Sequence, residues 1–406
     1  MNTRHTVAQL ITVTAMALVF WTGVADAATR KVCYRVMLAD DREECAKSSE
    51  TGARRPCKKG GYVDAVGHYI QLWDKDSGSS SNDEFIAKVV ISGGGRRCFT
   101  FEWENAPYSG GEANPDVYLR YINRVRNIRS SPAHRVRAQD ADGNDHVVTT
   151  WRNWVAKNCR RGRTCQISPV LVPTNDTSSE RGLWVMALDS AQHALQVFGT
   201  IMDTDIKMRF PVDIPHSVAK NRERIDIRPA RGNNGFTVAH EVGHVVMEQE
   251  FNEDDIVNGN GPTSQGWANY VAAVSWYDPD NSGTRPNLNR ISHLERAKPR
   301  EDECSDNAET YHAVAKAFWD LNDRNNEAGV SPASGDDDKL RFKSTRIAKG
   351  WRRFPNGTGN RQDQEAGDGA NMRDYYVNNR GRFGSSNAEF FETLIKHNCL
   401  QAQSDD

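Results

Sequence analysis

Several sequence features that mark common functional classes are absent from this chain of 406 residues. It has no Gly-rich phosphate-binding loop, no dinucleotide-binding fingerprint and no G-x-S-x-G nucleophile turn, which argues against nucleotide-dependent enzymes and serine hydrolases. Lys and Arg are spread along the chain instead of forming a basic arm, and the formal net charge is only −2. Bulk charge therefore gives no indication of nucleic-acid binding.

Long apolar runs are also missing, with one exception near the start. The run Leu10–Val24 is fifteen residues long, shorter than the roughly 20 residues of a membrane-spanning helix. It is followed by Ala25-Asp26-Ala27, a small-residue cleavage pattern. We interpret residues 1–27 as a secretory signal peptide and expect a secreted or periplasmic protein without membrane association after cleavage.

No two cysteines form a C-x-x-C pair, which argues against a cysteine zinc knuckle. Their number is eight, and an even number in an exported chain predicts disulfides. Eight cysteines allow about 105 pairings, so the spacing alone does not decide the connectivity. We expect local pairs first and then long-range ones: Cys45–Cys57, Cys159–Cys165, Cys33–Cys98 and Cys304–Cys399.

Residues 28–168 have the pattern of a disulfide-stapled antiparallel β-sandwich. Short segments with β-branched and aromatic residues alternate with turn signals such as DSGSSSND and SGGG. Within this part, His68–Val125 resembles a transthyretin-like exported module, with an L-W-D-x-D strand end, a polar loop and an aromatic strand. The Pro-, Ser- and Thr-rich residues 169–180 are predicted to be a linker.

Residues 181–406 have mainly helical periodicity. Together with the strand-rich part this predicts an α+β multidomain protein. Helices are expected at 183–201, 236–250, 263–276, 308–321 and 388–397, and strands at 207–214 and 224–230.

The segment TVAHEVGHVV contains H-E-x-x-H, formed by His240, Glu241 and His244. On a helix the two histidines lie one turn apart on the same side, where both imidazoles can bind one zinc ion. Glu241 is then placed to deprotonate a zinc-bound water. The strand-like RIDIRPA before this helix is a candidate edge for an extended substrate.

The chain resembles the gluzincins, the thermolysin and aminopeptidase branch of zinc metallopeptidases. The resemblance lies in HEVGH and in SQGWANY, about twenty residues later, and it covers about residues 183–325. It implies a zincin-like domain with His240, His244 and a third ligand from the second helix. The third position holds Gln265 where this family usually has Glu, and Asn269 stands where some members have an acid that orients a histidine. The metzincin pattern does not fit, because its later Gly and His are Met247 and Glu250 here.

Replacing the carboxylate by an amide leaves three alternatives open. Gln265 is a weak neutral ligand and the enzyme is active; or another acid, Glu250 or Glu309, binds the metal; or catalysis is lost and the protein binds peptides or a partner. We predict a secreted zinc-dependent peptidase with Zn²⁺ on His240, His244 and Gln265 and with Glu241 as general base. Its partners would be peptide or protein substrates, without nucleic acid. The rival classes are a non-catalytic binding protein on a degenerate peptidase fold and a structural envelope protein with an accidental motif.

Overall fold

A computed structural model describes the parts of the chain that follow. The described residues are 28–40, 61–76, 83–103, 114–128, 134–146, 149–150, 155–172, 180–232, 234–251, 262–277, 287–288, 291–292, 311–322, 342–353 and 372–379. The predicted signal peptide, the helix predicted at 388–397 and the pairs Cys45–Cys57 and Cys304–Cys399 lie outside them. None of the described helices combines the length and the apolar character that a bilayer crossing requires.

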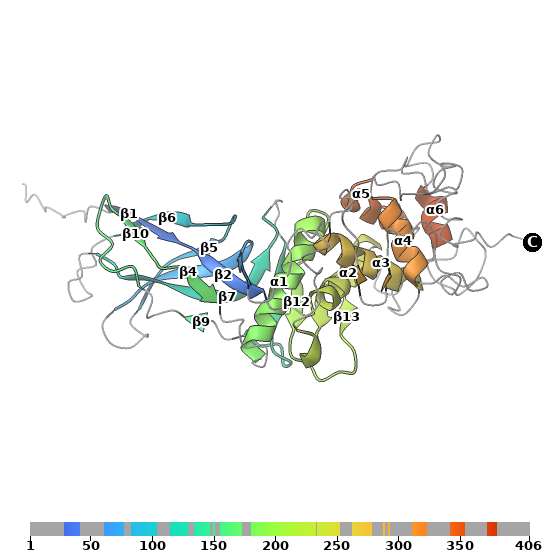
Figure 1. The fold of residues 1–406 in the computed structure, drawn as a ribbon, viewed down its shortest axis with the longest axis horizontal. Helices are drawn as coiled ribbons and strands as arrows, with labels where there is room; N and C mark the ends of the chain where they lie inside the picture. Colours follow the sequence, from blue (N-terminus) through green and yellow to red (C-terminus); the bar gives the residue numbers. More distant parts are fainter. Residues whose placement is uncertain are drawn as a thin grey trace, which may run out of the picture.

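The protein has mixed α and β content, with strands first and most helices later, so the coarse fold prediction is confirmed (Figure 1). The large sheet has eight strands in the order β13-β14-β12-β8-β7-β4-β5, with β9 paired to β7. Its strands are β4 (His68–Asp74), β5 (Glu84–Val90), β7 (Val117–Arg126), β8 (Arg135–Gln139), β9 (Thr149–Thr150), β12 (Ile206–Arg209), β13 (Val218–Asn221) and β14 (Arg224–Asp226).

Three smaller sheets complete the β structure. The first has the order β10-β1-β6, the second β11-β2-β3, and the third pairs β15 with β16. Their bounds are β1 (Ala28–Tyr34), β6 (Arg97–Trp103), β10 (Thr164–Gln166), β2 (Val36–Asp40), β3 (Gly61–Asp64), β11 (Val170–Val172), β15 (Asn287–Leu288) and β16 (Ile291–Ser292). Two of the predicted disulfides, Cys33–Cys98 and Cys159–Cys165, are formed. The first joins opposite residues of β1 and β6.

The prediction of a purely antiparallel β unit is wrong. β1 pairs with β10, β2 with β11, β8 with β12, and β12 with β14 in parallel. Parallel pairs need long connections, and these bring β12–β14 beside strands from the first third of the chain. The large sheet therefore contains strands from both sides of the predicted linker, and one continuous core includes residues from both.

The helices stack on one side of the large sheet. α1 (Glu180–Phe198) packs against β7 and β8, α2 (Gly235–Phe251) against α1, and α3 (Pro262–Trp276) against α2 (Figure 1). α4 (Tyr311–Asp320) then packs on α3, and the remaining elements are α5 (Ser344–Ala348), α6 (Met372–Asn379) and the 3₁₀ turns η1 (Pro229–Arg231) and η3 (Trp351–Arg353). The helices predicted at 183–201, 236–250 and 263–276 are thus found within a few residues of their expected bounds.

A buried polar network joins the sheet to α1. His68 on β4 lies 2.5 Å from the Tyr121 hydroxyl through Nδ1 and 3.0 Å from Asp189 Oδ1 through Nε2. His193, one turn after Asp189, lies 4.0 Å from its second oxygen and 3.3 Å from the Ser275 carbonyl on α3. Burial raises the pKa of Tyr121 well above its usual range, and Asp189 adds to the rise. Tyr121 is therefore an uncharged hydrogen-bonding group in this network.

Candidate functional site

Helix α2 places the three motif residues at the centre of the helical layer. Asn234 caps its start, because its side-chain oxygen accepts the Thr237 N–H at 2.8 Å. The apolar face of the helix is fully buried and consists of Val238, Ala239, Val242, Val245 and Val246. The opposite side carries His240 and His244, which face α3.

The two imidazoles converge on one point and are held from behind by α3. His240 Nδ1 lies 2.8 Å from Asn269 Oδ1, and His244 Nδ1 lies 2.9 Å from Ser264 Oγ. Their Nε2 atoms are 3.2 Å apart, and the Gln265 amide nitrogen lies 3.3 Å from that of His244. The structure thus brings Gln265 to the histidines, as the sequence predicts, and forms the predicted Asn269 contact. Ser264 was not predicted; its only signal is its place one residue before Gln265.

One proton arrangement satisfies the contacts of the two rings with Asn269, Ser264 and each other. His240 Nδ1–H donates to Asn269, Ser264 donates to His244 Nδ1, and His244 Nε2–H donates to His240 Nε2. The Gln265 amide nitrogen, a donor, then faces the His244 N–H, so this amide fits the arrangement only with its oxygen turned toward His244. Burial lowers the pKa of His240 to about 4, against the opposing bonds to Asn269 and Gln265. Burial, and then the neighbouring His240, lower the pKa of His244 well below its usual range. Both rings are therefore neutral near pH 7.

The predicted zinc cofactor is wrong. Among the residues that the structure describes, no group of three or more His, Cys, Asp or Glu could hold a metal ion. The candidate ligand set of His240, His244 and Gln265 ends in a neutral amide, and zinc sites are built from Cys, His and carboxylate donors. In the part of the chain that the structure describes, no carboxylate supplies the missing charge at this position.

The alternative acids do not complete the site either. Glu250 lies at the far end of α2, is 1% exposed and is bound by Arg352, which donates from Nη2 to Oε1 at 3.0 Å. Arg352 Nε lies 2.5 Å from the other oxygen. Burial raises the pKa of Glu250 to about 7, and Arg352 opposes this rise. Glu309 lies outside the described residues.

The glycine inside the motif, Gly243, lets two helices approach closely. A Cβ on Gly243 would lie 2.8 Å from the Ala268 Cα, so its absence allows the backbones of α2 and α3 to approach. Trp267 Nε1 uses this closeness and donates to the Gly243 carbonyl at 3.0 Å. Trp276 Nε1 makes the equivalent bond to the Gly235 carbonyl at 3.2 Å. Gly243 therefore serves the close packing of α2 on α3.

Glu241 points away from the histidine pair, toward the sheet. Its side chain is 5% exposed and accepts the backbone N–H of Ala219 on β13. Burial raises its pKa to about 8, and the Ala219 bond opposes the rise. Near pH 7 the side chain is a carboxylic acid. It is not the ready general base that the sequence predicts.

Glu241→Gln is expected to stabilise the protein at high pH. The folded pKa of about 8 lies above the unfolded value of 4.5, so the unfolding free energy of the wild type falls as pH rises from 4.5 to 8. Gln keeps an oxygen for the Ala219 N–H and removes this titration. We expect a gain on the order of 2–4 kcal/mol at pH 8 and little difference below pH 4.5.

Urea unfolding at a series of pH values measures this difference. Glu223→Gln, which removes an exposed carboxylate, should keep the wild-type pH profile. A Glu241→Gln profile parallel to that of the wild type would show that Glu241 is ionised in the folded protein.

Comparisons with known proteins identify no family for this chain. No family model and no curated protein matches it. A 9R-lipoxygenase from Cyanothece PCC8801 is similar over 42% of this chain and 23% of its own, at 15% identity and a TM-score of 0.19. A likeness this weak carries no argument about fold or activity. The gluzincin and transthyretin-like resemblances therefore find no support, and the gluzincin assignment is corrected because the three-ligand group is absent from the described residues.

Proposed function

We propose that the protein is an exported peptide-binding protein that holds an extended segment of a partner against strand β13. In the described sheet β13 is the terminal strand and pairs with β14 alone. A terminal strand has one row of backbone N–H and C=O groups without a strand partner, and an extended peptide can pair with such a row. The segment RIDIRPA, predicted as this edge, forms the interior strand β14 instead.

The observation that carries the proposal is the direct packing of helix α2 on β13, where the Ala219 amide counteracts the rise in the pKa of Glu241. β13 and helix α2 therefore face each other at the level of the H-E-x-x-H residues. The side chains of β13 are half-buried at Val218 and Ala219 and exposed at Lys220 and Asn221. A peptide paired with β13 would therefore run past the polar residues of α2 and α3.

The polar groups next to this edge are neutral and suit main-chain amides. His240 and Gln265 are half-buried, whereas Glu241, His244, Ser264 and Asn269 are buried behind them. The Gln265 amide offers both a donor and an acceptor. Neutral donors and acceptors recognise a peptide backbone without selecting for charge, which favours binding of extended polypeptide over catalysis.

Export is part of the same proposal. The two disulfides of the described residues are typical of proteins that mature in an oxidising compartment. The expected signal peptide at residues 1–27 supports the same location. We propose that the disulfide-bonded, strand-rich part stabilises the sheet from which β13 projects its edge.

Ala219→Pro tests this site. Pro is tolerated on edge strands where no ladder bond is lost, but it removes the Ala219 N–H that acts on Glu241, so an unchanged circular dichroism spectrum is required of this variant. The ring would block pairing of a peptide at this point of the edge. We expect at least tenfold weaker binding of a fluorescent, reduced and alkylated polypeptide, measured by anisotropy with the full chain.

The control is Lys220→Gln, which changes the neighbouring exposed side chain and leaves the backbone intact; it should bind within twofold of the wild type. Equal affinity of the Ala219→Pro and wild-type proteins would exclude β13 as the binding edge. Cleavage of the bound polypeptide by the wild type but not by Glu241→Gln would replace the binding proposal by a hydrolytic one.

A further inference from the structure

A row of cationic side chains crosses the face of the large sheet opposite α1. Val125, Val136, Met208 and Ile225 are fully buried on the helix side, so the residues next to them in each strand point outward. On four neighbouring strands these are Arg124, Arg137, Lys207 and Arg224. The registers place Arg124 opposite Arg137, Arg137 opposite Lys207, and Lys207 opposite Arg224.

A second like-charged pair lies beside the row. Arg126 is directly opposite Arg135 on the same two strands, β7 and β8. Directly opposed like charges destabilise a sheet. Lys88, on the edge strand β5, has its pKa lowered first by burial and then by Arg124, Arg135 and Arg137. These cations therefore act on one another and form one positive surface. We call this surface the basic row; its four central residues are Arg124, Arg137, Lys207 and Arg224, and Arg126, Arg135 and Lys88 lie beside them.

The acids near the basic row neutralise only part of it. Arg137 pairs with Asp145, Lys207 with Glu223 at 3.5 Å, and Arg224 with Asp226 at 3.3 Å. Within the described residues no acidic oxygen lies within 4 Å of the Arg124, Arg126 or Arg135 side chains. The exposed fractions of the Arg137 and Lys207 side chains are 40% and 56%. Exposed ion pairs of this kind contribute little to stability, so an anionic ligand can replace the acid.

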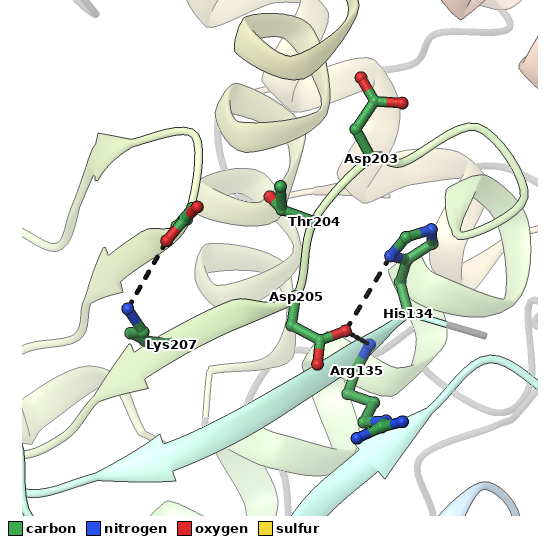
Figure 2. Close-up of a pocket in the computed structure, with 7 residues that line it drawn as sticks. His134, Arg135, Asp203, Thr204, Asp205 and Lys207 are labelled. Atoms are coloured by element: carbon green, nitrogen blue, oxygen red, sulfur yellow. Dashed lines mark hydrogen bonds and ion pairs between the residues drawn. The ribbon is translucent and has the colours of Figure 1, made fainter. Parts of the chain in front are cut away.

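A shallow pocket of about 500 Å³ lies at one margin of the basic row (Figure 2). Figure 2 shows Arg135 and Lys207 at its lining, with Asp205 between His134 and Arg135 and with Lys207 in its ion pair. Asp205 accepts the backbone N–H of Arg135 at 2.9 Å and lies 3.9 Å from His134 Nδ1. The Arg135 guanidinium is left for a ligand, and the carboxylates at this margin mark where the positive surface ends.

We propose that the basic row binds a linear anionic polysaccharide. Adjacent strands lie about 4.8 Å apart, so four cations on neighbouring strands span about 14 Å in one line. That is a track for a chain with closely repeated sulfate or carboxylate groups, which guanidinium groups bind with two parallel hydrogen bonds.

The surroundings favour a glycan over a nucleic acid. Single-stranded nucleic acids are held largely by bases that stack on aromatic rings. Two rings beside the basic row are covered by cations: the Lys88 ammonium lies 5.0 Å from the Tyr69 ring centre, and the Arg120 guanidinium 3.6 Å from that of Trp73. One exposed ring, Phe85, remains on the edge strand β5, edge-on to Trp73 at 5.4 Å. A single open ring is a poor platform for the successive bases of a nucleic acid.

The test uses heparin, a sulfated glycan, with the full chain in calorimetric titration at low and moderate salt. We expect saturable binding by the wild type that weakens with salt. The first variant neutralises three cations of the row: Arg124→Gln, Arg137→Gln and Lys207→Gln. It should bind heparin at least tenfold more weakly than the wild type, with an unchanged circular dichroism spectrum. A second variant, Arg126→Gln with Arg135→Gln, should show a smaller loss in the same direction.

The matched control removes the same number of charges from another exposed segment and should bind within twofold of the wild type; it carries Lys157→Gln, Arg160→Gln and Arg163→Gln. No binding of heparin by the wild type would overturn the proposal. An equal loss in the control would do the same, as would equally tight binding of single-stranded DNA that depends on the same three side chains.

Discussion

Trp267→Ala is expected to lower the free energy of unfolding by about 3–5 kcal/mol. Trp267 is fully buried and meets four other aromatic rings. Phe318 and Trp351 lie edge-on at centroid distances of 5.1 and 5.7 Å, and Phe198 lies edge-on at 6.0 Å. Tyr270 lies tilted at 5.3 Å. Removing the indole leaves a cavity where α1, α3, α4 and η3 meet, which close-packed neighbours can fill only in part.

Trp267→Phe separates packing from hydrogen bonding. Phe retains most of the apolar volume but removes the indole N–H that donates to the Gly243 carbonyl at 3.0 Å. That carbonyl keeps its bond within helix α2, so we expect a loss of about 0.5–1.5 kcal/mol, the net contribution of one hydrogen bond. Urea unfolding followed by circular dichroism measures both variants. A Trp267→Ala protein with wild-type stability would show that the aromatic cluster is not part of the cooperative core.

Asp189→Ala is expected to have an effect of similar size, about 3–5 kcal/mol, for an electrostatic reason. Asp189 is 2% exposed, and its Oδ1 lies 3.0 Å from Nε2 of the fully buried His68. Removal of the carboxylate leaves His68 Nε2 without a hydrogen-bond partner. This nitrogen is buried between β4 and α1, where no solvent can replace the partner.

Asp189→Asn is the matched control, because its amide oxygen can still accept from His68 and the volume is unchanged. It should lose clearly less stability than Asp189→Ala in the same urea titration. If the two variants were equally unstable, the negative charge itself, and not the hydrogen bond, would be the stabilising element of the network.

The features predicted correctly from sequence are those that repeat along the chain. α1, α2 and α3 are long, and their apolar residues recur at helical spacing, so these helices can be predicted without tertiary information. The pairs Cys33–Cys98 and Cys159–Cys165 are likewise found as predicted. By contrast, β8 and β13 were not predicted, because strands of five and four residues are too short to show a clear alternation of polar and apolar residues. Which strands they pair with depends on the tertiary structure, not on the local sequence.

The candidate site shows the same division. The spacing within H-E-x-x-H places His240 and His244 together, and the G-W-A-x-Y frame brings Gln265 to them, as predicted. The contact of Glu241 with Ala219 could not be predicted from the sequence. It joins helix α2 to strand β13, and the position of β13 depends on how the sheet is assembled. Zinc was predicted from a motif that supplies two ligands. Whether zinc binds depends on the third ligand, and that position holds the neutral amide of Gln265.

The parallel pairing of β8 with β12 has a consequence for how the protein is made. Val136 cannot find its partner Ile206 until the chain beyond the strand-rich part has been synthesised, and synthesis adds only about 5–20 residues per second. Until then β8 is an open edge able to pair with other chains. A shortened protein that stops before β12 should therefore aggregate instead of accumulating as a free module. Correct folding of the first part therefore depends on the arrival of β12.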